Sequence, residues 1–285
     1  MNCVIFDSYN DISKSSWDKL VQSSAYSNVF QTRKIYKLFD SIDNYNPFVF
    51  ACTVNNQIKV LFQGVIIREA GLKKNFSKRA IVWGGPILDD KDPKVKHYLQ
   101  KTIETVIYKI KKEAIYLEIR NFNNYDQYKD VFKENGFSYS EHLNFKVDCK
   151  NMDLAKSKIS KSKRRQINKS IKAGAEIFEA DSEKDILEFY EILKKLYRDK
   201  VKKPLMPKQF FLNFYKLKVG KYLLIKYQDK IVGGIMCPIL DVNTIYEWFV
   251  VGQDAFYPNI YPSVLSTWAA IDYANKNNIK TFDFM

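Results

Sequence analysis

The chain has 285 residues and a formal charge of +14 at pH 7. Hydrophobic residues make up 46% of it, which is enough to bury a substantial core and excludes a disordered chain. No uninterrupted apolar run approaches the roughly 20 residues that cross a bilayer. We therefore expect no transmembrane segment, although contact with a membrane surface stays open. The positive charge favours partners that carry phosphate, namely nucleic acid, anionic lipid or a phosphorylated substrate.

The cysteines and histidines indicate neither a metal site nor a secreted protein. The four cysteines have no paired spacing and only two histidines accompany them, so the sequence has no zinc signature and we expect no metal. Scattered cysteines in a lysine-rich chain fit a reducing compartment. The first residues, "MNCVIFDSYND", lack the pattern of a signal peptide. These features together predict a cytoplasmic protein.

The first half of the chain predicts two helices, a β-hairpin, a further strand, a helix and a strand, in that order. The hairpin turns at Asn55-Asn56, between two strands rich in apolar and β-branched residues. The helices, the hairpin and the last strand are expected at residues 15–24, 32–39, 47–67, 94–112 and 114–120.

The second half repeats this order, displaced by about 165–175 residues. Its hairpin turns at Gln228-Asp229. Its elements are expected at residues 182–200, 207–217, 221–240, 262–276 and 279–284. The repetition predicts an α/β (α+β) protein of two tandem domains, 1–150 and 151–285, each a mixed sheet flanked by helices. The alternative is two unrelated α/β domains that look alike by chance.

A cationic segment, "SKSKRRQINKSIKAG" (160–174), follows an expected strand at 143–149. Residues 154–175 contain eight lysines and arginines and no acidic residue, and the remainder of 151–285 is balanced in charge. We expect a helix that ends at Gly174, with Ile167 and Ile171 on one face and a cationic stripe on another. The stripe comprises Lys161, Arg165, Lys169 and Lys172. A solvated surface is the alternative interpretation.

Five motifs in the same order resemble the Fem family (FemA/FemX-like) of peptidoglycan-bridge aminoacyltransferases, and together they span nearly the whole chain. The cationic segment is the best match. The motifs are "FQTRKIYKLF" (30–39), "IVWGGPILDD" (81–90), "YLEIRNFNNY…KENGF" (116–137), "SKSKRRQINKSIKAGAEI" (160–177) and "YPSVLSTWAAIDYANKNNIKTFDF" (261–284).

The resemblance implies two tandem acetyltransferase-like (GNAT-type) domains and a defined reaction. An amine of a muropeptide precursor, lipid-linked or nucleotide-linked, would attack the ester carbonyl of an aminoacyl-tRNA and pass through a tetrahedral oxyanion. Aminoacyl-tRNA would be the co-substrate, and neither a metal, a cofactor nor a covalent enzyme intermediate is implied. The partners would be this cell-wall precursor and tRNA, with peripheral membrane contact but no DNA.

The resemblance and the residue types also suggest site residues. Arginine offers a planar fork that suits phosphate oxygens, so Arg164 and Arg165, with Lys163, are expected to bind phosphate. The family uses a lysine near Lys37 for substrate phosphate, although a surface lysine is an equal alternative. The residues expected to line a substrate cleft are Gln31, Trp83, Arg120, Tyr257 and Tyr261.

Several of these residues have plainer interpretations. Trp83 fits a buried position at a strand end, and Arg120 can pair with Glu118 or Asp126. Glu247 and Asp283 lie in apolar strands, where either could act as a general base if burial raised its pKa. A carboxylate on the exposed face of the sheet is the alternative for both, so the sequence identifies no catalytic residue.

Two other functions stay open. One is acyl-CoA-dependent transfer, with acetyl-CoA as donor, to a nucleotide sugar or another cell-envelope amine. That reaction needs a glycine-rich phosphate cradle at a helix start, but "VGQDAFYPNIYPSVLS" (251–266) has two prolines and the stretch after Trp83 is acidic. The other is a non-catalytic binder of RNA or of an anionic glycolipid.

The C-terminal motif departs from the family. There the Asp-Phe strand continues into a glycine-rich turn and a Phe-Lys pair that aids the transition state, whereas this sequence stops at "TFDFM". We expect the second domain to be truncated at its C-terminal end.

Overall fold

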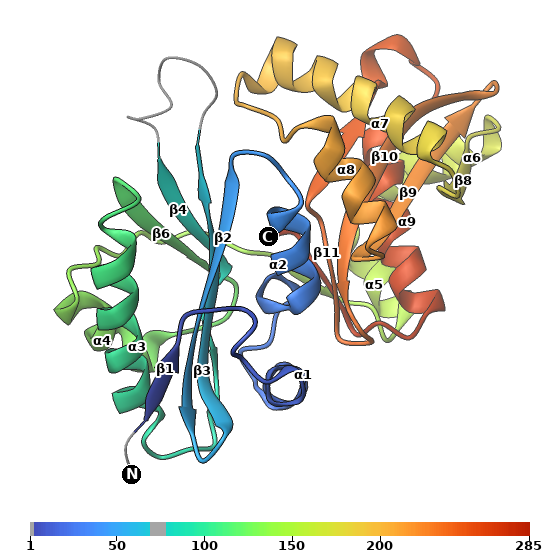
Figure 1. Cartoon of the computed structure of the whole chain (residues 1–285). Coiled ribbons are helices and arrows are strands. Elements are labelled where there is room, and N and C mark those ends of the chain that lie inside the picture. The colour runs from blue at the N-terminus through green and yellow to red at the C-terminus, as the bar shows by residue number, and fades with distance from the viewer. Residues whose placement is uncertain (1–2, 69–77) are drawn as a thin grey trace. The chain divides into compact units, whose positions relative to one another are not determined.

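The computed structural model describes residues 3–68 and 78–285, apart from the side chain of Leu154. The chain divides into two compact units, Met1–His142 and Leu143–Met285, each with its own sheet (Figure 1). The division lies eight residues before the expected boundary at 150/151. Strand β7 (Lys146–Asp148) pairs antiparallel with β13 (Thr281–Asp283), so it belongs to the second sheet and not to the first domain.

The first unit contains a mixed sheet with the order β1-β2-β3-β4-β6, in which β5 also pairs with β3. Among the described residues of this sheet, the β4–β6 pair is parallel and the other pairings are antiparallel. Its principal elements are β1 (Val4–Phe6), α1 (Lys14–Ser23), α2 (Arg33–Asp40), β2 (Tyr45–Val54), β3 (Gln57–Ile67), β4 (Arg79–Gly84), β5 (Ile87–Leu88), α3 (Val95–Ile110), β6 (Tyr116–Asn121) and α4 (Lys129–Glu134).

Helices cover both faces of this sheet, α1 and α2 on one side and α3 and α4 on the other (Figure 1). Leu99, Ile103 and Val106 recur at helical spacing along α3, and they are buried in one cluster with Phe50 and Phe62 of the hairpin. The hairpin strands are apolar on both sides because both faces are covered.

The second unit has a sheet with the order β7-β13-β11-β10-β9-β8, in which β12 also pairs with β10. Its elements are β7, α5 (Met152–Lys158), α6 (Lys161–Lys172), β8 (Glu176–Glu179), α7 (Glu183–Leu196), a short π-helix (Tyr197–Val201), α8 (Lys208–Lys216), β9 (Gly220–Tyr227), β10 (Lys230–Leu240), β11 (Thr244–Tyr246), β12 (Phe249–Gly252), α9 (Pro262–Lys276) and β13.

The two units share one plan, as the repeated order of elements predicts. In each, a strand and two helices precede a hairpin with a two-residue turn. Asn55 and Asn56, and likewise Gln228 and Asp229, have φ between 49° and 62°, as a type I′ turn requires. In each, the strand after the hairpin is interrupted, giving β4 and β5 in one unit and β11 and β12 in the other. The first part of that strand then pairs in parallel with the strand that follows the long helix.

Within the described residues, no helix has both the length and the apolarity needed to cross a bilayer.

Candidate functional site

Helix α6 carries the cationic segment, and local interactions define both of its ends. Ser160 caps the start, where its Oγ accepts a hydrogen bond from the Lys163 amide at 3.3 Å. Gly174 follows the end with φ of +93°, as expected for a helix cap. Of the two isoleucines expected on one face, Ile167 is buried and Ile171 is 49% exposed. Ile167 and Ser170 are the buried residues of the helix, and most of its surface faces solvent.

Six exposed side chains of α6 line an open hollow along this helix. They are Lys161, Arg164, Arg165, Asn168, Lys169 and Lys172. No carboxylate forms an ion pair with any of the five cations within the described part of the chain. Lys163, expected to act with the two arginines, does not line this hollow. The structure adds Arg164 and Asn168 to the predicted stripe.

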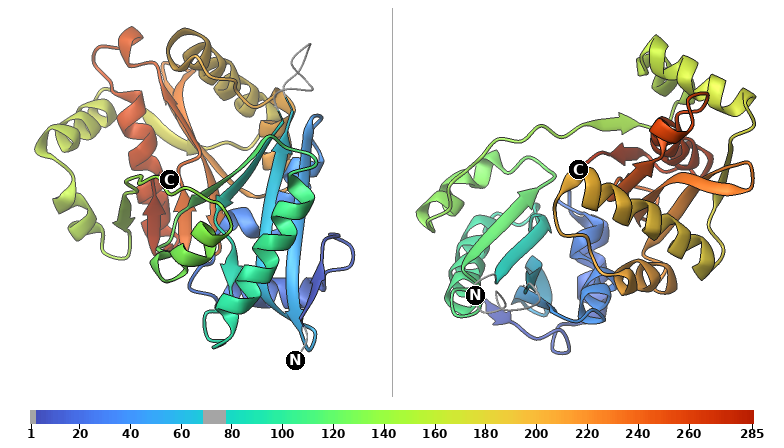
Figure 2. Two further views of the ribbon diagram at one scale, coloured as in Figure 1. Left: turned by 90° about the vertical axis from the view of Figure 1, so that its left-hand side faces the viewer. Right: turned by 90° about the horizontal axis from the view of Figure 1, so that it is seen from above.

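Helix α6 packs beside the start of α9, and this contact brings a predicted aromatic residue to the cationic stripe (Figure 2). The Tyr261 amide donates to Ser170 Oγ at 2.9 Å, and Lys169 Nζ lies 5.8 Å from the centroid of the Tyr261 ring. Tyr257, the other predicted aromatic residue, is partly buried and contacts the Tyr227 ring edge-on. Of the two, Tyr261 is the one that joins the cationic surface.

Glu247 lies in the interruption between β11 and β12, where its amide donates to the Asp283 carbonyl at 2.9 Å. Its side chain is partly buried, and burial raises the pKa of this carboxyl from 4.5 to about 7, against a smaller opposing effect of a hydrogen bond from Thr267. Thr267 Oγ1, on α9, lies 3.2 Å from Glu247 Oε2. Glu247 is therefore not on an exposed sheet face and can exchange a proton near neutral pH. No sequence pattern pointed to Thr267, which lies 20 residues later in the chain, on α9.

Asp283 was the other candidate base, but the structure gives it a different role. Its side chain is 1% exposed, so the expectation of an exposed carboxylate is wrong here too. Asn144 Nδ2 and the Met285 amide both donate to Oδ1 at 2.9 Å, and Lys146 Nζ lies 3.3 Å from Oδ2. These contacts tie β13 to the β7 segment, so the Asp283 carboxylate serves the structure of this sheet edge.

In the first unit the equivalent interruption, between β4 and β5, is filled by side chains. Gln31 Nε2 donates to the Gln63 carbonyl at 2.8 Å, and the Gln63 amide donates to Gln31 Oε1 at 2.7 Å. The Gln31 side chain thus replaces a strand neighbour that β3 lacks at this point. Because Gln31 is 0% exposed, its predicted contact with a substrate is wrong.

Two further side chains close the same interruption. Asn28 Nδ2 donates to the Gly84 carbonyl at 3.2 Å, and Tyr125 Oη donates to the Pro86 carbonyl at 2.7 Å. Gly84 and Gly85 have φ of +80° and +75°, which lets the strand turn away at this point. The two interruptions therefore differ: an amide and a phenol hydrogen-bond to the backbone in the first unit, whereas the second unit has a titratable carboxylate.

The remaining predicted residues of the first unit divide between core and surface. Trp83 is 6% exposed and stacks on Phe39 at 5.4 Å, so it belongs to the core and its predicted place in a cleft is wrong. Arg120 is exposed, with Nε 2.7 Å from Glu118 Oε1 and its guanidinium 5.7 Å from the centroid of the Trp83 ring. The pairing with Glu118 was one of the two expected for it. Lys37 is exposed on α2.

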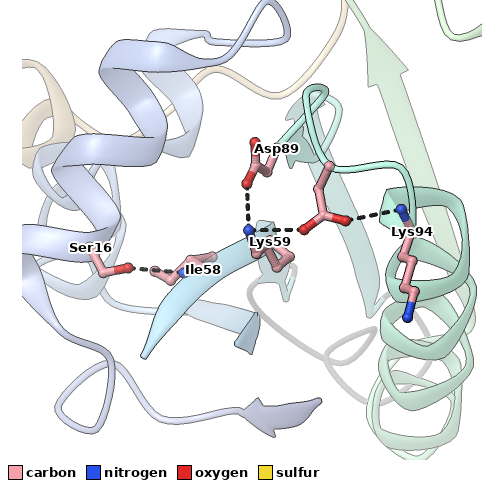
Figure 3. Close-up of polar contacts among 6 residues, drawn as sticks. Ser16, Ile58, Lys59, Asp89 and Lys94 are labelled. Carbon is pink, nitrogen blue, oxygen red and sulfur yellow. Dashed lines mark hydrogen bonds and ion pairs between the residues drawn. The ribbon is translucent and has the colours of Figure 1, made fainter. Parts of the chain in front are cut away.

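The helix starts that would cradle a CoA pyrophosphate are occupied by carboxylates of the chain itself. At α3, Asp92 Oδ1 accepts from the Lys94 amide at 2.9 Å, and Lys59 Nζ lies 2.8 and 2.9 Å from Asp89 and Asp92 (Figure 3). At α9, Asp254 Oδ1 accepts from the Ser263 amide at 3.4 Å. These carboxylates use amides that would otherwise bind phosphate, and their charge repels it.

Comparison with solved structures identifies the fold. The crystal structure of FemX superposes with a TM-score of 0.72 at 14% sequence identity, covering 100% of this chain and 88% of that one. The chain has the tandem GNAT fold. A tandem GNAT protein from the clavulanic acid biosynthesis pathway matches with a TM-score of 0.57, at 8% identity over 99% of this chain and 89% of that one. L-PGS from Bacillus licheniformis matches with 0.53, at 11% identity over 96% of this chain and 76% of that one.

The predicted resemblance to FemX-like proteins is thus confirmed for the fold. At these low sequence identities, the structural similarity shows the fold alone. No protein-family model matches the sequence, and no curated protein matches it either.

Proposed function

We propose that the protein is a Fem-like aminoacyltransferase. It transfers an amino acid from aminoacyl-tRNA to an amine of a peptidoglycan precursor, on the cytoplasmic side where charged tRNA is found. The fold it shares with FemX and with L-PGS supports acyl transfer in general. The observation that carries the proposal is Glu247, a carboxyl with a pKa of about 7 at the strand interruption of the second unit.

Glu247 has the properties that amide formation requires of a general base. The acceptor amine is protonated at neutral pH and must lose a proton before its nitrogen can attack the ester carbonyl carbon. Glu247 takes this proton and releases it to solvent. After the attack the nitrogen loses its second proton, the carbon–oxygen bond to the ribose breaks, and the departing oxygen takes up a proton. The products are an amide and a free ribose hydroxyl, with one proton released.

The second candidate is acyl-CoA-dependent transfer, which the structural similarity to a tandem GNAT protein supports. The carboxylates at the starts of α3 and α9 argue against it, because a pyrophosphate would have to displace Asp92 or Asp254. We expect calorimetry with acetyl-CoA to show no binding at micromolar concentrations. Micromolar binding would favour this second candidate.

Substitution of Glu247 tests the proposal. We expect Glu247→Gln to lower kcat for transfer from a mixture of charged tRNAs to a nucleotide-linked muropeptide about 100-fold, because general base catalysis contributes on this order. The rise of the rate through pH 7 should also disappear. Glu188→Gln, on the exposed side of α7, is the matched control. It should keep the wild-type kcat and the rise of the rate through pH 7. An unchanged rate and pH profile in Glu247→Gln would remove this residue from the mechanism.

A further inference from the structure

We propose that the exposed face of α6 binds the phosphate backbone of RNA. This inference rests on the proposed function, because it names the substrate that the cationic surface holds. A substrate diphosphate is the rival ligand, since the same side chains could bind either.

The length of the cationic stripe favours a polyanion. Lys161 and Lys172 are eleven residues apart, which corresponds to about 16 Å along a helix that rises 1.5 Å per residue. Each strand of a nucleic acid duplex presents a phosphate every few ångströms along the axis, about 3.4 Å in B-form DNA, so the stripe matches several successive phosphates. A diphosphate joins two phosphorus atoms through one oxygen and would reach only one or two of these side chains.

The absence of compensating acids within the described residues also indicates an external anion. Helix α7 of the same unit carries exposed lysines too, but each has a glutamate nearby: Lys184 Nζ lies 4.0 Å from Glu188 and Lys194 Nζ lies 3.9 Å from Glu191. The stripe of α6 has no such neighbours, so its charges repel one another until an anion binds. This difference between α6 and α7 shows that unpaired lysines are not a general property of the surface of this unit.

The other groups on this surface fit RNA better than a membrane. Of the apolar residues of α6, Ile167 is buried and only Ile171 is exposed, so little can enter a lipid headgroup layer. Arg164 and Arg165 offer planar forks for phosphate oxygens. The partly exposed Tyr261 ring beside Lys169 adds an aromatic surface on which a base can stack.

Fluorescence anisotropy with a labelled 12-base-pair RNA hairpin, uncharged and ending in CCA, tests this inference on the whole chain. The double variant Arg165→Ala, Lys169→Ala should weaken binding more than tenfold at low salt. It should also reduce the slope of log affinity against log salt by about two, one for each lost phosphate contact. The matched control Lys184→Ala, Lys194→Ala removes the same charge from α7 and should keep affinity and slope. Circular dichroism should show both variants folded.

Several outcomes would overturn the inference. Equal weakening in both double variants would mean that net charge, and not α6, binds RNA. Unchanged RNA binding in the α6 variant, with lost binding of uridine diphosphate or of phosphatidylglycerol vesicles, would assign the stripe to a diphosphate or to a membrane. Because the hairpin carries no amino acid, specific RNA binding without acyl transfer would contradict the proposed function alone. Acyl transfer that is unimpaired in the α6 variant, with RNA binding unchanged, would contradict this inference alone.

Discussion

At the scale of single residues, the number of polar partners distinguishes the two inward-facing carboxylates of the second unit. Asp283 is buried, and its carboxylate contacts an amide side chain, a backbone amide and a lysine. Among the described residues, the Glu247 carboxyl has one hydrogen bond, from Thr267, and burial raises its pKa to about 7. A carboxylate that lacks compensating partners is costly for folding and useful as a base.

This cost makes a prediction about stability against pH. The pKa of Glu247 rises from 4.5 to about 7 on folding, so the folded state binds its proton more tightly than the unfolded state does. Below about pH 4.5 the residue is neutral in both states and costs nothing. The penalty grows as pH rises to about 7 and then stays, at about 3 kcal/mol in order of magnitude. In urea titrations, Glu247→Gln should therefore match the wild type at pH 4.5 and exceed it at pH 8. Equal stability at pH 8 would mean that this carboxyl is not desolvated.

A second residue-scale prediction concerns Gln31. Replacing it by Leu leaves the amide and carbonyl of Gln63 buried without a partner, and each such group costs about 1–3 kcal/mol. We expect Gln31→Leu to lower the free energy of unfolding by about 2–5 kcal/mol in urea titrations. Gln22→Leu, at an exposed position of α1, is the control and should be nearly neutral. A loss below 1 kcal/mol for Gln31→Leu would show that the interruption can close without the amide.

At the scale of elements, the interrupted strand is the feature that distinguishes the units. In the first unit the chain turns away at Gly84 and Gly85, and Asn28 and Tyr125 hold it there. In the second unit the interruption contains Glu247, and the facing part of β10 includes Pro238, which has no N–H to satisfy. The same order of strands therefore contains an interruption held by side-chain hydrogen bonds in the first unit and an interruption with a titratable carboxyl in the second.

Two glycines with similar backbone angles allow the packing of Asn28 against the turn at Gly84 to be measured. Gly84 has φ of +80° and a Cβ there would lie 2.3 Å from Asn28, whereas Gly136 has φ of +83° with nothing within 4 Å. Gly136→Ala should cost about 1 kcal/mol from backbone strain alone, and Gly84→Ala should cost at least about 2 kcal/mol more because Asn28 must move. Thermal and urea unfolding check both values. Equal losses would mean that Asn28 is not packed tightly against the turn.

At the scale of the whole molecule, the chain consists of two units with separate sheets, and the excess charge of residues 151–285 is confined to residues 154–175. The boundary at His142–Leu143 matters because β7 is an outer strand of the second sheet. Without β7, the edge of β13 would be exposed and Asp283 would lose Asn144 and Lys146.

This boundary predicts how fragments behave. Residues 143–285 should fold by themselves, with a cooperative urea transition, whereas residues 151–285 should be less stable by several kcal/mol because a buried carboxylate loses its partners. Circular dichroism and urea titration of the two fragments make the comparison. Equal stability would place the boundary at 150/151, as the sequence alone suggested.

Local sequence determined much of this protein. The hairpin turns at Asn55-Asn56 and Gln228-Asp229, the helix end at Gly174, the cationic stripe and the repeated order of elements were all predicted correctly, because neighbouring residues encode turns, caps and periodicity. Tertiary structure alone decided which residues of the candidate site are accessible. Gln31 and Trp83 proved buried, Glu247 acquired a raised pKa, and β7 joined a strand more than 130 residues later in the chain. Burial and strand pairing depend on residues distant in the sequence, so no local pattern reveals them.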